Sequence, residues 1–198
     1  MADFHRVSIT DDNFIRGAAR LLWAAITQAF PSTVSDIINL SSYDAQTGWN
    51  DLGATKTGIT ITHNSTEETF DVDQILGDID SRPVTYEQTV STQLAEMTLE
   101  RLQVAWEAGT ITTAGGFRAM GVGEPPIYTR RRIAVLFQKS NLKIRAHVFR
   151  RCQRSPQESA IAYNKTGEQQ SVPLRFRALA DTSILDVNLR TQVIFDEV

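Results

Sequence analysis

The segment 58–109 constrains the fold of this chain more than any other stretch of the sequence. Over 59–94, apolar and polar side chains alternate in three runs, which are separated by polar turns at 63–66 and at Gly77. A period of two with one apolar face is typical of antiparallel strands that are buried on one side only. The apolar residues then change to helical spacing, which predicts one amphipathic helix over 95–108. Its sheet-facing side chains are Ala95, Leu99, Leu102 and Trp106.

The remaining apolar runs predict further strands. The segment 17–30 has the length and density of a buried strand, although its alanines are also compatible with a helix. Later runs alternate again, with a hairpin turn at 139–141. We therefore expect one mainly β domain over 1–198 with one principal helix. The alternating runs are 132–138, 144–148, 160–164, 172–178 and a final run that ends near Ile194 and Phe195.

Two long segments, 41–57 and 109–131, are rich in turn residues and are expected to be loops. Loops of this length are uncommon in compact domains and are usually functional or disordered. The first carries large apolar groups that need a partner surface to leave water, so we expect it to contact another molecule. The second is rich in glycine but lacks a phosphate-binding glycine pattern. Residues 1–16 are polar and are expected to form an N-terminal arm outside the core.

Charge is unevenly distributed along the chain, although the net charge is only −3. Residues 1–100 hold fifteen acidic and five basic residues, whereas 101–198 hold eight acidic and fifteen basic residues. Such asymmetry suggests complementary surfaces, either within the fold or between copies. The arginines around 130–132 and on the later strands fit a basic sheet face better than a nucleic-acid site, because the sequence pI is about 5.6.

The sequence contains no residue spacing that indicates catalysis or metal binding. The acids in 67–80 lack the spacing of a calcium loop, and His5, His63 and His147 form no pair with zinc-ligand spacing. Cys152 is the single cysteine, which fits a reducing compartment and a buried structural role. We also find neither a signal-peptide pattern nor an apolar run of the roughly 20 residues that span a membrane. We therefore expect no enzyme, no cofactor, no metal and no membrane anchor.

Several short motifs, none of them diagnostic alone, follow one another along most of the chain. They are 17–23 (GAARLLW), 48–56 (GWNDLGATK), 70–74 (FDVDQ) with Gly77, 80–83 (DSRP), 94–96 (LAE), 98–102 (TLERL), Arg131-Arg132, 143–151 and 173–178. In this order they resemble the major tail tube proteins of tailed bacteriophages. The same fold family includes the tube proteins of secretion-system injection devices.

The resemblance implies a β-sandwich or half-barrel with one flanking α-helix and long loops. It also implies that six copies close into a ring whose inner strands form a continuous β-barrel, and that rings stack into a tube. Genome DNA would pass through this tube without sequence-specific binding. The implied partners are other copies of the chain, a tail terminator, a baseplate or initiator complex and, where the tail is contractile, sheath proteins. The implied location is the virion tail, after synthesis in the host cytoplasm.

The resemblance gives two groups of residues an expected role. Carboxylates facing the lumen would repel DNA phosphates, whereas a basic wall would bind them. The expected lumen-lining residues share one polar strand face, with the strand at 143–145 as an alternative: Thr69, Asp71, Asp73, Thr85, Glu87 and Thr89. The expected contacts between stacked rings lie in the first loop: Tyr43, Trp49, Asp51 and Leu52.

Two other classes of function compete with the tube subunit. The chain could instead be another tail component, such as a neck, terminator or baseplate protein. It could also be a monomeric β-barrel binding module or hydrolase. Particle size separates these classes, because a tube subunit forms rings or long polymers and a monomeric module stays small.

Overall fold

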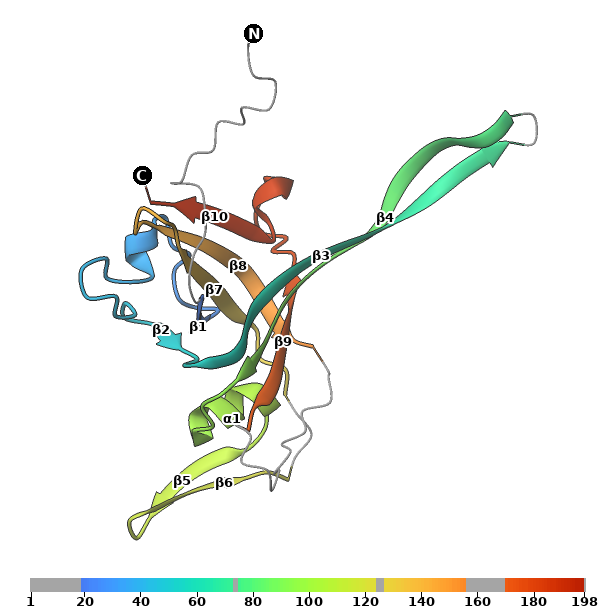
Figure 1. Cartoon of the computed structure of the whole chain (residues 1–198). Helices are drawn as coiled ribbons and strands as arrows, with labels where there is room; N and C mark the ends of the chain where they lie inside the picture. Colours follow the sequence, from blue (N-terminus) through green and yellow to red (C-terminus); the bar gives the residue numbers. More distant parts are fainter. Residues whose placement is uncertain (1–18, 73–74, 124–126, 156–169, 198) are drawn as a thin grey trace.

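The computed structural model describes residues 19–72, 75–123, 127–155 and 170–197, with the backbone alone described between 70 and 79. The described part is mainly β, with a single α-helix (Figure 1). The strands before the helix are β1 (Arg20–Ala25), β2 (Trp49–Asp51), β3 (Thr55–Val72) and β4 (Ile75–Leu94). The helix α1 (Leu99–Trp106) is followed by β5 (Thr110–Ala114), β6 (Phe117–Gly121), β7 (Arg131–Gln138), β8 (Ile144–Arg154), β9 (Val172–Leu179) and β10 (Gln192–Asp196). Short 3-10 turns lie at Val34–Asp36 and Val187–Leu189.

Eight of these strands form one antiparallel sheet. Its order is β2-β1-β7-β8-β9-β4-β3. The strand β10 also pairs with β8, on the same edge of β8 as β9 but nearer to the start of β8. This sheet curves around its own core as in a sandwich or half-barrel, which confirms the expected fold class. The strands expected from the runs at 132–138, 144–148, 172–178 and 194–195 are confirmed as β7, β8, β9 and β10.

The central strands are buried on both faces. Leu21 of β1 belongs to the cluster that includes α1, β8 and β9, whereas the next residue, Leu22, belongs to a second cluster with the segment 34–49. Four consecutive residues of β7, from 133 to 136, are buried for the same reason. Strands covered on both sides have a continuous apolar run. The alternative of a helix over 17–30 is therefore wrong, and the dense apolar segment is β1.

The helix is shorter than expected. It begins after Thr98, whose side chain accepts a hydrogen bond from the Arg101 N–H, so Ala95 lies before the helix in the turn that leaves β4. Leu102 and Trp106 are partly buried against the core, and Leu99 is half-buried outside it. The fully enclosed helix residues, Val104 and Ala105, were not among the expected contacts.

The expected meander of three strands is wrong. The residues 63–66 do not turn but continue β3, pairing with 85–88 of β4, and Gly77 lies inside β4. β3 and β4 therefore form one long hairpin, whose ladder shifts register between Thr66 and Glu67. Figure 1 shows the outer part of this hairpin projecting far from the rest of the sheet.

The second expected loop, 109–131, is also partly wrong. It contains the hairpin β5–β6, which pairs from Thr110↔Gly121 to Ala114↔Phe117 and projects on the side opposite to the β3–β4 hairpin (Figure 1). Gly115 and Gly116 form its turn with φ of 57° and 81°, a conformation that glycine adopts without strain. The N-terminal arm at 1–16 and the strand expected at 160–164 lie outside the described residues.

Candidate assembly surfaces

The outer part of the β3–β4 hairpin is a two-stranded ribbon with no neighbouring strand among the described residues. β9 pairs with β4 only from Thr89 to Leu94, so residues 63–72 and 75–88, which we call the ribbon, extend beyond it. At about 3.3 Å per residue, the ribbon reaches roughly 30 Å past the body. Its described side chains from 63 to 69 and from 80 to 86 are all exposed.

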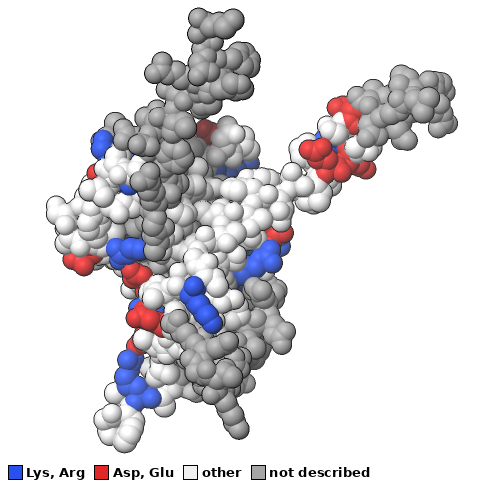
Figure 2. Space-filling model, viewed as in Figure 1, with Lys and Arg blue, Asp and Glu red and all other residues white. Residues whose placement is uncertain are grey.

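The ribbon is held by a few cross-strand contacts between exposed side chains. The hydroxyls of Thr66 and Thr85 are hydrogen bonded at 2.5 Å, and Arg82 pairs with Glu68 at 2.9 Å. Tyr86 is 60% exposed. An isolated two-stranded hairpin is marginally stable in water, and an exposed pair such as Arg82–Glu68 adds little. Figure 2 shows acidic side chains gathered along this projection. The ribbon is therefore a surface that a partner would stabilise.

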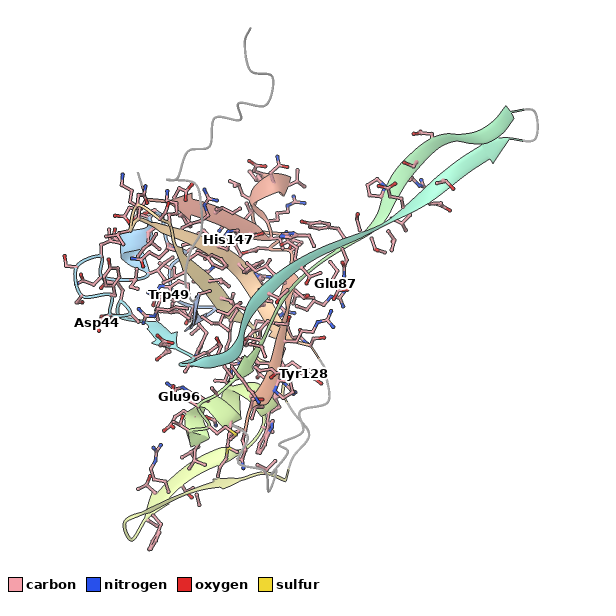
Figure 3. The ribbon with its side chains drawn as sticks, viewed as in Figure 1. Asp44, Trp49, Glu87, Glu96, Tyr128 and His147 are labelled. Carbon is pink, nitrogen blue, oxygen red and sulfur yellow. The ribbon has the colours of Figure 1, made fainter. Side chains whose placement is uncertain are left out.

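The loop 41–57 does not present its apolar groups to a partner. Trp49 lies on β2, pairs with Ala24 of β1 and is only 5% exposed (Figure 3). Leu52 is fully buried, and its N–H donates to the Leu21 carbonyl at 2.9 Å. The premise that these two residues need a neighbouring molecule is wrong, because β2 and the residue that follows it carry them into the core of their own chain.

The other two residues of this group remain at the surface. Asp51 accepts hydrogen bonds from Arg20 at 2.5 and 3.1 Å, so its charge is already paired. Tyr43 is 43% exposed at the tip of the loop with a left-handed φ of 59°. Of the four residues expected at a ring contact, Tyr43 alone combines a large apolar surface with exposure.

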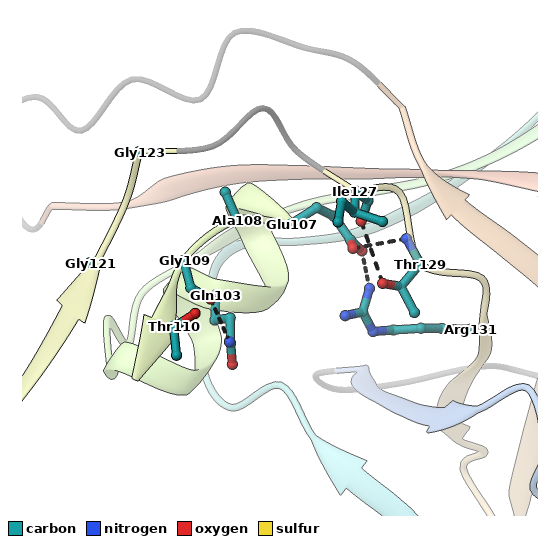
Figure 4. Close-up of a pocket in the computed structure, with 10 residues that line it drawn as sticks. All are labelled: Gln103, Glu107, Ala108, Gly109, Thr110, Gly121, Gly123, Ile127, Thr129 and Arg131. Atoms are coloured by element: carbon teal, nitrogen blue, oxygen red, sulfur yellow. Dashed lines mark hydrogen bonds and ion pairs between the residues drawn. The ribbon is translucent and has the colours of Figure 1, made fainter. Parts of the chain in front are cut away.

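A cavity of about 670 Å³ lies where α1 meets the start of β7 (Figure 4). Glu107, the helix C-cap with a left-handed φ of 52°, places its buried carboxylate here. The carboxylate pairs with Arg131 and accepts the Thr129 N–H at 3.0 Å. Removal from water lowers the pKa of Arg131, whose guanidinium also lies 5.1 Å from the centre of the Trp23 ring. Glu107 and Arg131 are the charged residues among the described lining, and they neutralise each other. The cavity therefore offers a structural ion pair rather than a free acid or base.

The comparison with known families decides the identity. The model of a family described as phage tail tube protein matches residues 9–189. The chain belongs to the phage tail tube protein family. Comparison with curated protein sequences gave no match. Membership makes this tail tube protein a structural component of a phage tail, assembled with other tail proteins.

The residues expected to line the lumen of the tube do not share one face. Thr85, Glu87 and Thr89 pair with Thr66, Asn64 and Thr62, so they lie on one side of the hairpin. Beyond the register shift, Thr69 pairs with Ser81 and falls on the other side, because it lies three positions, an odd number, after Thr66 on β3. The expected common face is therefore wrong.

These residues also differ in accessibility. Thr69 and Thr85 are exposed, while Glu87 is half-buried beside Arg177 at 3.4 Å. Thr89 is only 2% exposed in the single chain. The side chains of Asp71 and Asp73 lie outside the described residues. Whether any of the six faces a lumen stays a prediction.

The remaining reactive groups of the tail tube protein are enclosed or scattered. Cys152 is buried, as expected from its sequence context, and burial raises the pKa of its thiol. Over the described ranges, no three histidine, cysteine or acidic side chains gather as metal ligands would. None of the helices in that part of the chain is long and apolar enough to cross a membrane.

Sequence reasoning missed the Glu107–Arg131 pair and the polar contacts of Gln88 at the base of the ribbon. Glu107 has the same spacing as the exposed Glu96 and Glu100, so its burial had no sequence signal. The β5–β6 hairpin did have one, since Gly115-Gly116 lies between two short runs that contain threonine or aromatic residues.

Proposed function

We propose that the chain is the repeating subunit of a bacteriophage tail tube, in which homohexameric rings stack and enclose a lumen that conducts the genome into the host. The ribbon carries this proposal. It is a two-stranded extension, about 30 Å long, whose described side chains beyond its base, at 63–69 and 80–86, are all exposed. A second copy is the partner always present at equal concentration.

Strand edges supply a separate contact for closing a ring. Over the described residues, β2 and β3 are the end strands of the sheet, and β10 has β8 as its single neighbour. Exposed edges pair readily with other strands unless they are protected. A ring that joins edges of adjacent copies closes on itself, whereas a head-to-tail contact between rings propagates into a tube. We assign the ribbon to the propagating contact, which replaces the earlier assignment to Trp49 and Leu52.

The proposed partners follow from this assembly. Rings would end on a tail terminator at one side and on a baseplate or initiator complex at the other, with sheath proteins outside in a contractile tail. DNA would pass without sequence-specific binding, and the chain would have no catalytic role. Synthesis in the host cytoplasm precedes assembly.

The decisive experiment is negative-stain microscopy of the purified chain with a ribbon-shortened variant beside it. Replacing 67–84 by Asn-Gly would join the paired residues Thr66 and Thr85 through a two-residue turn that hairpins favour. We expect wild type to form tubes and this variant to remain folded by circular dichroism but to form rings or monomers.

A matched control shortens the other projecting hairpin. Replacing 113–118 by Asn-Gly joins Thr112 and Ala119, which are also paired. Loss of tubes in the ribbon variant alone supports the ribbon contact, whereas equal loss in both variants removes its special role. A wild-type chain that stays monomeric at high concentration, also with an initiator complex present, overturns the tube-subunit proposal. That outcome would favour another tail component or a monomeric module.

A further inference from the structure

The outer part of the ribbon carries acidic groups that its own chain leaves unpaired. The side chains at 63–69 and 80–86 include three acids, Glu67, Glu68 and Asp80, and one base, Arg82. Arg82 pairs with Glu68 at 2.9 Å. Glu67 and Asp80 have no ion-pair partner in the described part of the chain. The described side chains beyond the base of the ribbon therefore leave two exposed carboxylates without a counter-charge.

Two arginines of β9 form a basic surface on the body of the same molecule. Arg175 and Arg177 alternate with buried core residues of their strand, so they point away from the core. The residues paired directly with these arginines share their side of the sheet and are uncharged: Thr89 and Ser91 of β4 and Gln153 of β8. We call these five residues the arginine face. Glu87, labelled in Figure 3, is an acid at its edge, 3.4 Å from Arg177.

The fold keeps these two surfaces apart within one molecule. Arg177 lies in a row of paired residues that continues through β4 to Thr62 of β3. Glu67 is five residues beyond Thr62 on β3, and Asp80 is paired at a level eight residues beyond Thr62. At about 3.3 Å per residue, these carboxylates lie roughly 17 and 26 Å from that row. Charges so far apart are largely screened in physiological salt, where the Debye length is about 8 Å.

A second copy of the chain is the partner that suits both surfaces. Figure 2 shows acidic side chains along the projection and basic side chains on the body, so one copy offers what the other lacks. Patches of opposite sign favour specific docking. Double-stranded DNA would match the arginine face but not the acidic ribbon. The acid-rich first half of the sequence supplies the ribbon and the base-rich second half supplies β9, so the charge asymmetry of the sequence fits a contact between copies.

We propose that the ribbon of one copy docks on the arginine face of a second copy, where Glu67 and Asp80 meet Arg175 and Arg177. This inference rests on the proposed function for its place between stacked rings, and it names the surface that receives the ribbon. The contact is head-to-tail, because two different surfaces meet, and it therefore propagates. One exposed ion pair contributes little, but a ring presents several such contacts at once and their effects accumulate.

Charge reversal on each surface tests the docking. The ribbon-reversed variant is Glu67→Lys with Asp80→Lys, and the face-reversed variant is Arg175→Glu with Arg177→Glu. Either variant alone has a ribbon and a face of the same sign, which repel each other. In an equimolar mixture, each ribbon again meets a face of opposite sign on the other variant. Circular dichroism checks that both variants fold. Arg177→Glu alone replaces the face-reversed pair if that pair does not fold, because the Arg177 side chain is 56% exposed.

Sedimentation velocity measures the association and requires no tube. We expect the mixture to reach a weight-average mass at least about twice that of either variant alone at the same total concentration. Salt at about 1 M, where the Debye length is about 3 Å, should remove this gain. The matched control, Asp44→Lys with Lys143→Glu, exchanges an acid and a base outside both surfaces and should associate as wild type.

A mixture no larger than its separate components would overturn the docking. So would a face-reversed variant that assembles by itself as wild type does, because the arginine face would then be open to another occupant such as DNA. A mixture that associates without forming rings or tubes would support the docking and reject the proposed function. Wild-type tubes without rescue in the mixture would do the reverse, so the two proposals fail separately.

Discussion

Removal of the Glu107 carboxylate should destabilise this protein more than any single change at its surface. Glu107→Ala leaves the Arg131 guanidinium, whose side chain is 11% exposed, without its counter-charge. Breaking a buried ion pair in this way costs about 3–5 kcal/mol, because the remaining charge is held out of water. The left-handed backbone at φ 52° offers no compensation, since alanine adopts it no more readily than glutamate. The loss is about a third of the 5–15 kcal/mol by which folded domains are stable.

Urea unfolding followed by tryptophan fluorescence measures this loss. A loss of this size should lower the unfolding midpoint by about 1–2 M urea, given the slope expected for small proteins. Glu100→Ala is the matched control on the same helix, because its partner Arg118 is half-exposed and water replaces the lost contact. The control should leave the midpoint essentially unchanged.

A double variant separates the charge from the packing. Replacing the pair by Ala and Met, as Glu107→Ala with Arg131→Met, removes the unpaired charge and should recover most of the lost stability. A loss below about 1 kcal/mol for Glu107→Ala would refute the reasoning. That result would mean that water reaches Arg131 and that the pair does not hold the end of α1 against β7.

Two further predictions concern the core. Trp49→Ala should lower the free energy of unfolding by about 3–5 kcal/mol, because Trp49 belongs to a buried cluster with residues of β1, β7, β8 and the segment 34–38. A chain of unchanged stability that only fails to form tubes would restore the original interface interpretation. Cys152, buried and with a raised pKa, should react with a thiol reagent at mildly alkaline pH only after urea unfolding, and rapid reaction of the native chain would show that β8 opens locally.

The strands that could be predicted from the sequence are those whose two faces differ or whose faces are both apolar. β7, β8 and β9 pack against the core along their length, so their apolar residues either alternate or run continuously. The ribbon side chains from 63 to 69 are all exposed and all polar, so they carry no periodic signal. The segment 63–66 therefore had the composition of a turn although it forms strand.

The contacts of single side chains were less predictable because they depend on distant parts of the chain. Trp49 had the sequence context of a loop, since three residues are too few for a period to appear, and its burial follows from pairing with β1. Glu107 is enclosed only because Arg131 and Thr129 return to the end of the helix. Gln88 is polar but is in phase with Tyr86 and Val90 along β4, and β10 comes back across its side chain.

The register shift in the ribbon affects how readily a free subunit aggregates before it assembles. Beyond Gln88, neither edge of the ribbon has a neighbouring strand among the described residues, and open flat edges invite aggregation. At the shift, Glu67 faces Pro83, which has no N–H to offer a passing strand, and the extra residue Val84 bends the edge of β4. Glu67 and Glu68 add charge along β3. The irregularity therefore protects the edge of a long extension from pairing with other strands before the docking that we propose takes place.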